Sequence, residues 1–171
     1  MKPDRILQLS IVALLAVFVF VLYSSLHEIE VHAGDKAPDF SVTASNGKIM
    51  TPKNFGGKLL ILNFWATWCP PCVEETPSLI ELSQLLAPKG LVVLAVSVDA
   101  KKEAYDKFLK RFNVPFPTFF DPDQKINVSY GSVAYPETYL IDASGKVIEK
   151  IIGPENWTGQ QMLDHINGLL N

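Results

Sequence analysis

The stretch "FWATWCPPC", Phe64–Cys72, contains both cysteines of this 171-residue chain, and only two residues separate them. The run that leads into it, "KLLILNFWA" (58–66), is continuously apolar, which is typical of a strand covered on both faces. The run that follows, "VEETPSLIELSQLLAPKG" (73–90), has apolar residues at helical spacing until Pro88 and Gly90. The cysteines are therefore predicted to lie where a buried strand ends and a helix begins.

The remaining segments predict an α/β domain around this strand and helix. We expect a β-hairpin over 38–51, a second buried strand over 91–99, a helix over 100–113, a mixed strand and helix segment over 114–131, two antiparallel strands over 137–153, and a closing helix over 158–170. Strand–helix–strand alternation predicts a parallel centre with helices on both faces, and the late pair of strands adds an antiparallel edge. Asp99 and Thr158 are the expected N-caps of their helices, the latter in a capping box with Gln161.

An apolar segment near the N-terminus predicts a membrane anchor. Ile6–Tyr23 carries no charge, and as a helix its 18 residues would span about 27 Å, close to the hydrocarbon core of a bilayer. Lys2 and Arg5 precede it and acidic residues follow, which predicts a cytoplasmic N-terminus and a C-terminal part outside. The protein is thus expected in the cytoplasmic (inner) membrane as a single-pass protein with a periplasmic or other extracytoplasmic domain.

The chain then divides into a stub and anchor (1–23), a polar tether (24–35) and the α/β domain (36–171). Val31-His32-Ala33 also fits the small-x-small pattern of a cleavage site, so removal of the N-terminal segment is an open alternative to retention.

The composition excludes several classes of function. The net charge is −3 and no Lys/Arg run is present, so nucleic acid is not an expected partner. A zinc or iron–sulfur site needs more ligands than two cysteines and three scattered histidines provide. We expect no metal and no cofactor beyond a redox-active Cys69–Cys72 disulfide.

The position of the cysteines assigns them chemical roles. If Cys69 is the N-cap, Pro70 occupies the first helical position, where its missing N–H costs nothing. A helix N-terminus lowers the pKa of a cysteine, and the thiolate is the nucleophile. Cys69 is then expected to be exposed and to attack a disulfide, while Cys72, one turn further and more covered, resolves the mixed disulfide.

The two prolines bear on the direction of the reaction. An N-cap group accepts from the N–H of the second or third helical residue, and Pro71 at the second has none. We therefore hypothesise that the Pro70-Pro71 pair leaves the Cys69 thiolate less stabilised than a Gly-Pro pair would, which favours a reducing couple.

"NFWATWCPPC", together with "APDF" (37–40), Glu75, Pro77 and "YPETYLID" (135–142), resembles the thioredoxin superfamily, and in particular its membrane-anchored thiol–disulfide oxidoreductases of the TlpA/ResA/CcmG type. The resemblance covers roughly 34–171. It implies a thioredoxin-like fold and a helix kink at Pro77. It also implies a cis peptide bond at Pro136, which would leave Tyr135 extended toward a substrate strand.

The same resemblance directs attention to other residues around the site. Asn63 stands where thioredoxins have a buried, proton-accepting aspartate, and an amide cannot take up a proton. Glu75, three residues after Cys72 and on the same helix face, is the candidate substitute, because burial would raise the pKa of its carboxyl. Glu137 is expected near the site, and Trp68 is expected to shield the disulfide.

These observations predict a membrane-anchored reductase of protein disulfides. Its substrate could be the CxxCH motif of apocytochrome c during cytochrome c maturation, since several relatives of this type serve that process. Two cysteines leave no internal route to regenerate the dithiol, so a membrane thiol-reductase is expected as electron donor. A thiol peroxidase is one alternative, and a non-catalytic module for metal delivery or binding is another.

Overall fold

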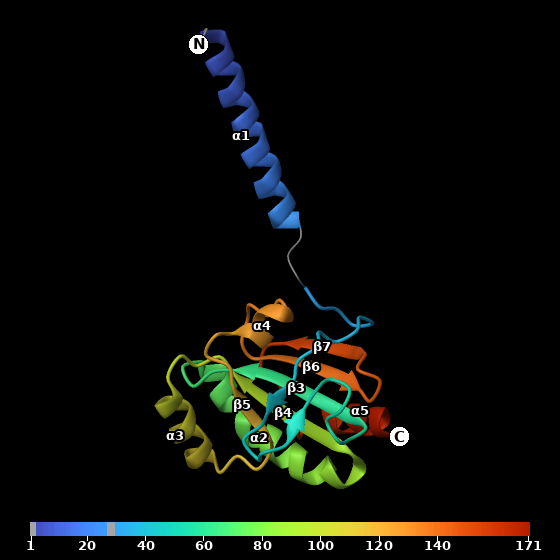
Figure 1. Ribbon diagram of the computed structural model, residues 1–171. Coiled ribbons are helices and arrows are strands. Elements are labelled where there is room, and N and C mark those ends of the chain that lie inside the picture. Colours follow the sequence, from blue (N-terminus) through green and yellow to red (C-terminus); the bar gives the residue numbers. More distant parts are fainter. Residues whose placement is uncertain (1–2, 27–29) are drawn as a thin grey trace.

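The computed structural model describes residues 3–26 and 30–171 and contains one five-stranded mixed sheet. The strands lie in the order β5-β4-β3-β6-β7, and helices flank the sheet (Figure 1). The sheet is built from β3 (Leu59–Trp65), β4 (Leu91–Ser97), β5 (Thr118–Phe120), β6 (Glu137–Asp142) and β7 (Val147–Ile152). The helices are α1 (Pro3–Leu26), α2 (Pro70–Leu86), α3 (Lys102–Phe112), α4 (Lys125–Ser129) and α5 (Gln160–Leu170), with a 3-10 turn over Ala87–Lys89.

The centre of the sheet is parallel and one edge is antiparallel, as expected. β3 pairs in parallel with β4 from Leu59↔Leu91 to Trp65↔Ser97, and β4 pairs in parallel with β5. β6 runs antiparallel to both β3 and β7. All seven residues of β3 are buried, because the strand is covered on both faces. The thioredoxin-like α/β fold is therefore confirmed.

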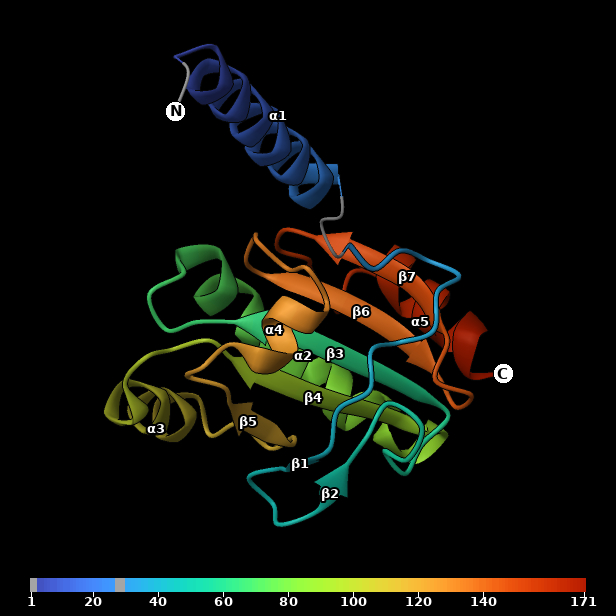
Figure 2. The same cartoon turned by 45° about the horizontal axis from the view of Figure 1, so that its top comes forward.

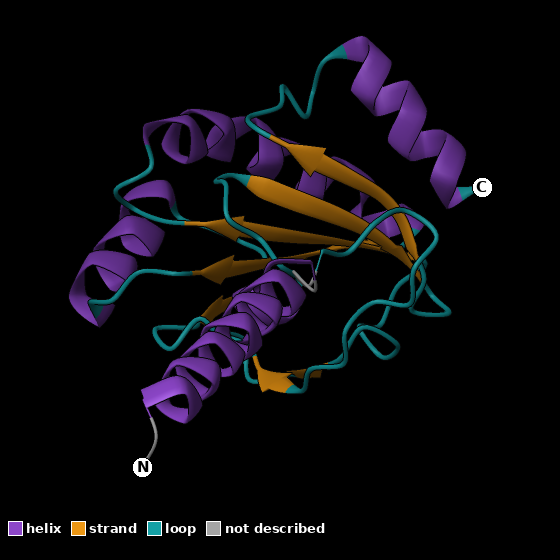
Figure 3. Cartoon of the chain, turned by 90° about the horizontal axis from the view of Figure 1, so that it is seen from above, coloured by secondary structure: helices purple, strands orange, loops and turns teal. Residues whose placement is uncertain are grey.

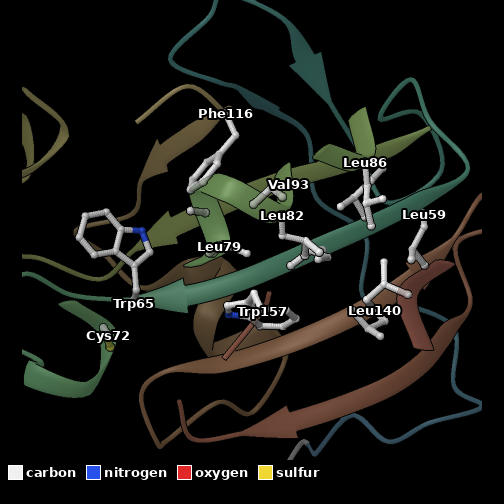
Figure 4. Close-up of a cluster of buried hydrophobic side chains, with 14 of the residues drawn as sticks. Leu59, Trp65, Cys72, Leu79, Leu82, Leu86, Val93, Phe116, Leu140 and Trp157 are labelled. Atoms are coloured by element: carbon white, nitrogen blue, oxygen red, sulfur yellow. The ribbon is translucent and has the colours of Figure 1, made fainter. Parts of the chain in front are cut away.

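Two hydrophobic clusters lie on opposite faces of the sheet. The cluster beneath α2, α3 and α5 is drawn in Figure 4, and its labelled members include Leu59, Leu79, Leu82, Leu86, Val93, Leu140 and Trp157. The second cluster lies beneath α4 and the N-terminal part of the domain and includes Leu60, Leu62, Phe64, Ile126, Tyr130 and Tyr139. Because side chains alternate along a strand, Asn63 and Trp65 share the α2 face while Phe64 points to the other. Figure 3 shows the orange strands side by side with helices around them.

A small antiparallel pair precedes the sheet in the chain. It consists of β1 (Val42–Thr43) and β2 (Ile49–Met50), with the Asn46-Gly47 turn between them. The pair forms a separate two-stranded sheet on the β4 side of the domain (Figure 2). Each strand is only two residues long, which is shorter than the segment 38–51 suggests.

The helix α1 extends away from the domain (Figure 1), and its large apolar side chains between Leu9 and Leu22 are exposed. Across residues 3–26 and 30–171, no helix combines the length and apolar character needed to cross a membrane. The anchor over Ile6–Tyr23 therefore stays a prediction. Part of the tether expected over 24–35, namely residues 27–29, lies outside the described residues.

The second half of the expected tether packs on the domain. Val31 is buried, and Glu30 pairs with Lys150 of β7 at 3.3 Å. Gly34 donates its N–H to the carbonyl of Val147, whose own N–H is bonded to the carbonyl of Asp35. Backbone pairing along β7 thus holds the chain against the sheet before residue 36.

Two of the expected helix caps are wrong. Lys101, not Asp99, is the N-cap residue of α3, and it makes no side-chain cap bond. The carboxylate of Asp99 instead accepts hydrogen bonds from Thr67, on the loop before α2. Gly159, not Thr158, is the N-cap residue of α5, so no capping box forms there.

Candidate active site

Cys69 and Cys72 form a disulfide at the carboxyl end of β3, where α2 begins. Their Sγ atoms are 2.11 Å apart and their Cα atoms 5.3 Å apart. Cys69 is the N-cap residue of α2 and has an extended backbone, and the two prolines stand at the start of the helix. The local geometry expected from the spacing of the four residues is therefore confirmed.

The first turn of α2 offers the sulfur of Cys69 one backbone donor. The N–H of Cys72 donates to Cys69 Sγ at 3.3 Å. Pro70 and Pro71 cannot donate, because proline has no backbone N–H. The positive end of the helix dipole still points at this sulfur, so a thiolate on Cys69 is favoured in part.

The exposure of Cys69 differs from expectation. Cys72 is 1% exposed, and Cys69 is only 4% exposed, although it was expected to be the open one. In the disulfide, Cys69 Sγ is bonded to Cys72 Sγ and accepts a hydrogen bond from the N–H of Cys72. An attacking role for Cys69 therefore involves the reduced form of the site.

Trp68, which is next to Cys69 in the chain, contacts a second aromatic side chain. Trp68 precedes Cys69 in the chain and is 62% exposed. Its ring meets Tyr135 edge to face, with the centroids 5.8 Å apart. The Tyr135–Pro136 peptide bond is cis, as the resemblance implies. Trp65 lies on the inner side, where it packs against Phe108.

Glu75 is a buried carboxyl group one turn after Cys72 on α2. The residue is 4% exposed and has donors on both oxygens. Asn63 Nδ2 donates to Oε1 at 3.0 Å. The N–H of Glu155 and the indole Nε1 of Trp157 donate to Oε2 at 3.1 and 3.3 Å. These contacts tie α2 to β3 and to the segment that follows β7.

Burial raises the pKa of Glu75 to about 7 from an ordinary value of 4.5. The hydrogen bonds from Glu155, Asn63 and Trp157 act in the opposite direction, because they favour the charged form. Desolvation is the larger effect, so the carboxyl changes its charge near neutral pH. A group with such a pKa can accept a proton from a neighbouring thiol and release it again.

A surface cavity adjoins Glu75 and the segment that follows β7. A surface cavity of about 350 Å³ is lined by Glu74, Glu75, Pro77, Ser78, Pro154, Glu155 and Asn156. Glu75, although buried, therefore forms part of the wall of this cavity. Pro77, inside α2, forms part of the cavity wall.

Asn63 is a partner of Glu75 and not a proton acceptor itself. Its Nδ2 atom donates to Glu75 and also to Thr138 Oγ1 of β6 at 2.9 Å. The amide thus holds one carboxylate oxygen in a fixed position beneath α2. An aspartate at this position could not donate in the same way when ionised.

Glu137 is near Pro136 in sequence, but its side chain belongs to another group of residues. It is 1% exposed, accepts a hydrogen bond from the hydroxyl of Tyr139, and lies 3.3 Å from Lys150 Nζ. Tyr139 belongs to the cluster on the α4 face, whereas Asn63 and Glu75 lie on the α2 face. The structure therefore does not bring Glu137 together with Glu75.

Sequence reasoning missed several residues of this site. Glu155 and Trp157 reach Glu75 from 80 and 82 positions later, and no sequence motif marks them. Asp99 lies two residues after the end of β4, a place where functional groups collect in α/β sheets. That position is a signal for Asp99, for which the sequence pattern predicts only a helix cap.

The chain matches the family model described as Redoxin over residues 32–170. The thiol-disulfide oxidoreductase ResA of Bacillus thuringiensis subsp. konkukian is 35% identical over 170 residues, which cover 97% of each chain. ResA of Bacillus subtilis is 34% identical over 134 residues, with 78% of this chain and 74% of that protein covered.

The same likeness is found among solved structures. A crystal structure from Chlorobium tepidum, described as a thiol:disulfide interchange protein of DsbE type, superposes with a TM-score of 0.75 at 32% identity. The match covers 83% of this chain and all of the other. The Cys69–Cys72 disulfide at the start of α2 agrees with the thiol–disulfide chemistry that these names describe. The chain belongs to the Redoxin family and is a thiol–disulfide oxidoreductase of the TlpA/ResA/CcmG type within the thioredoxin superfamily.

Proposed function

We propose that the protein reduces protein disulfides outside the cytoplasm, with its domain anchored to the membrane. The substrate class that fits best is an exposed CxxC disulfide in a polypeptide, such as the CxxCH motif of apocytochrome c during cytochrome c maturation. The relatives named thiol-disulfide oxidoreductase support the redox chemistry, and the substrate and the direction are parts of the proposal.

The reaction begins with the reduced site. The Cys69 thiolate attacks one sulfur of the substrate disulfide, and the other sulfur leaves as a thiolate that takes up a proton. The Cys72 thiol then gives its proton to Glu75 and attacks Cys69 Sγ. The Cys69–Cys72 disulfide forms, the second substrate sulfur leaves as a thiolate, and two electrons have passed to the substrate.

The observation that carries the direction is the hydrogen bonding of Cys69. One N–H, that of Cys72, reaches its sulfur from the first turn of α2. A thiolate with few donors is less stable, and a less stable dithiol state makes the couple more reducing. Pro70 and Pro71 are therefore the residues that favour reduction of a partner over oxidation.

The location rests on the sequence before the domain. The uncharged run Ile6–Tyr23, with Lys2 and Arg5 before it, supports a single-pass anchor in the cytoplasmic membrane. Two cysteines in the whole chain leave regeneration to an external dithiol, for which we propose a membrane thiol-reductase.

The reduction potential of the Cys69–Cys72 couple tests the direction. We expect a value closer to that of thioredoxin, about −270 mV, than to that of the oxidant DsbA, about −120 mV. Equilibration with glutathione or dithiothreitol buffers, followed by mass spectrometry after alkylation, measures it. A potential near the DsbA value would overturn the assignment as a reductase.

The variants Pro70→Gly and Pro71→Ala test whether the two prolines make the Cys69–Cys72 couple reducing. Each restores one N–H in the first turn of α2, so the pKa of Cys69 should fall and the couple should become less reducing. The pH dependence of Cys69 alkylation gives the pKa in each protein. If the pKa is unchanged or higher in both variants, the prolines do not set the direction.

A further inference from the structure

Asp99 is a buried carboxylate beside the active site that takes no part in the steps above. It follows β4 and is 2% exposed. Its two oxygens lie 3.2 and 3.1 Å from the backbone nitrogen of Thr67. Oδ1 also accepts from the Thr67 hydroxyl at 2.7 Å, and Oδ2 accepts from the Ser97 hydroxyl at 2.7 Å. The carboxylate therefore links the end of β4 to the loop between β3 and α2.

All of these partners are donors, which suits an ionised carboxylate because that group only accepts. Within residues 3–26 and 30–171, no lysine, arginine or histidine forms an ion pair with Asp99. Its charge is therefore balanced by hydrogen bonds, chiefly those of Thr67. Moving Thr67 away would leave a buried charge short of donors, which is costly.

Thr67 stands at the centre of the loop that carries the reactive cysteine. Residues on either side of it are also held, because the carbonyl of Trp65 accepts from Val98 N and that of Ala66 accepts from Cys69 N. The exposed Trp68 lies between Thr67 and Cys69. Its direction, and that of the sulfur beside it, depend on where Thr67 is fixed.

We infer that Asp99 is a positioning residue for substrate recognition. It holds Thr67, and through Thr67 it orients Trp68 and Cys69 toward an incoming protein disulfide. This inference rests on the proposed function, because it concerns how a polypeptide substrate meets the site. A small disulfide can approach the sulfur from many directions and depends less on this orientation, whereas a polypeptide must match the surface around it.

The test compares two substrates on the full chain. The variant Asp99→Asn removes the charge and replaces one acceptor oxygen with a donor that faces Thr67. We expect kcat/KM for insulin disulfide reduction to fall about tenfold, since small misplacements of reacting groups have effects of this order or larger. The rate of the reduced protein with the small disulfide 5,5′-dithiobis(2-nitrobenzoate) should change by no more than about twofold. The ratio of the insulin rate to this small-disulfide rate should therefore fall.

Matched variants separate positioning from loss of stability. Thr67→Val removes the hydroxyl donor and should also lower this ratio. Thr67→Ser keeps the hydroxyl donor and should keep the ratio of the wild type. Asp142→Asn is the control, because Asp142 likewise accepts from a serine N–H and hydroxyl, those of Ser144, but in the turn between β6 and β7. A general loss of stability would lower both rates together.

Hydrogen exchange gives a readout that does not require activity. The Thr67 amide should exchange faster in Asp99→Asn, because its acceptor is altered. An unchanged rate ratio in Asp99→Asn, or equal ratios in Thr67→Val and Thr67→Ser if Asp99→Asn does not fold, would overturn the inference. If the wild-type protein reduces no protein disulfide, the proposed function fails instead, and faster exchange at Thr67 then supports only the link between Asp99 and the loop.

Discussion

We propose Glu75 as the proton acceptor for Cys72, because its carboxyl is buried and its pKa is raised to about 7. It lies one turn further along α2, and its carboxyl changes charge at a pH of about 7. Its three donors stabilise the charged form without outweighing desolvation. An acid of this kind is protonated or ionised in comparable amounts near neutrality, so it can both take and release a proton during the reaction.

The substitution Glu75→Gln should flatten the pH dependence of Cys72 reactivity around neutral pH. In a Cys69→Ser background Cys72 is the one remaining thiol, so its alkylation can be followed from about pH 5 to about pH 9. The parent should show an inflection near the pKa of Glu75 in addition to that of the thiol. The glutamine variant should show the thiol inflection alone, because glutamine does not titrate.

Glu74→Gln is the control for this experiment. Glu74 is the neighbour of Glu75 on the same helix, and i and i+1 residues do not share a face. Its profile should match that of the parent. Identical profiles for the parent and Glu75→Gln would reject the role of Glu75.

At the scale of the element, α2 both presents the disulfide and fastens it to the sheet. Its N-terminal turn carries the two cysteines, while Leu79, Leu82 and Leu86 pack into the cluster of Figure 4. These positions recur at the spacing of one helix face. The apolar face thus fixes the orientation of the turn that bears the sulfurs.

The substitution Leu82→Ala should destabilise the protein by about 2–5 kcal/mol, because Leu82 is fully buried and its removal leaves a cavity. Leu85→Ala is a matched control on the same helix, since Leu85 is 55% exposed, and its effect should stay within about 0.5 kcal/mol. Denaturant unfolding of the oxidised proteins measures both. Similar losses for the two variants would contradict the packing described for α2.

At the scale of the whole molecule, Glu75 joins segments that are distant in the chain. It bonds to Asn63 of β3 and to Glu155 and Trp157 beyond β7. The free energy of unfolding therefore depends on its charge. Its pKa is raised in the folded state, so the folded protein binds more protons than the unfolded chain between about pH 4.5 and about pH 7.

The contribution of Glu75 to stability should be fully present below about pH 4.5 and should be lost as the pH rises through about 7. A pKa difference of this size corresponds to about 3 kcal/mol at most. Subtracting the unfolding free energies of Glu75→Gln from those of the wild type across this range isolates the effect. A difference that does not vary with pH, or that grows with pH, would contradict the raised pKa.

The local geometry of the disulfide could be predicted from sequence because it depends on neighbours. The spacing of Cys69 and Cys72 at a helix start, with proline at the first helical position, leaves little freedom for the backbone. The parallel centre and the antiparallel edge of the sheet also followed from the pattern of apolar runs and turns. The separate hairpin sheet and the packing of the chain from Glu30 onward depend on contacts that the pattern does not contain.

Asp99 illustrates the limit of sequence reasoning. A carboxylate after a strand can cap the next helix or reach a neighbouring loop, and both choices satisfy its oxygens. The adjacent ends of β3 and β4 bring Thr67 within hydrogen-bond distance, so the loop is the partner that forms. The same reasoning applies to Glu137, whose place in a strand next to Pro136 does not reveal which face it points to.

By itself, the sequence determined the family, through the motifs that it shares with known members. It also determined the fold class and the place of the two cysteines at a helix start, because these depend on local spacing and on the periodicity of apolar residues. The tertiary structure alone decided the surroundings that set the chemistry. It gave Glu75 its raised pKa through burial and supplied two of its three donors from 80 and 82 positions away, and it turned Asp99 toward the active-site loop. Desolvation and hydrogen bonding are properties of packed surroundings, which chain neighbours do not specify.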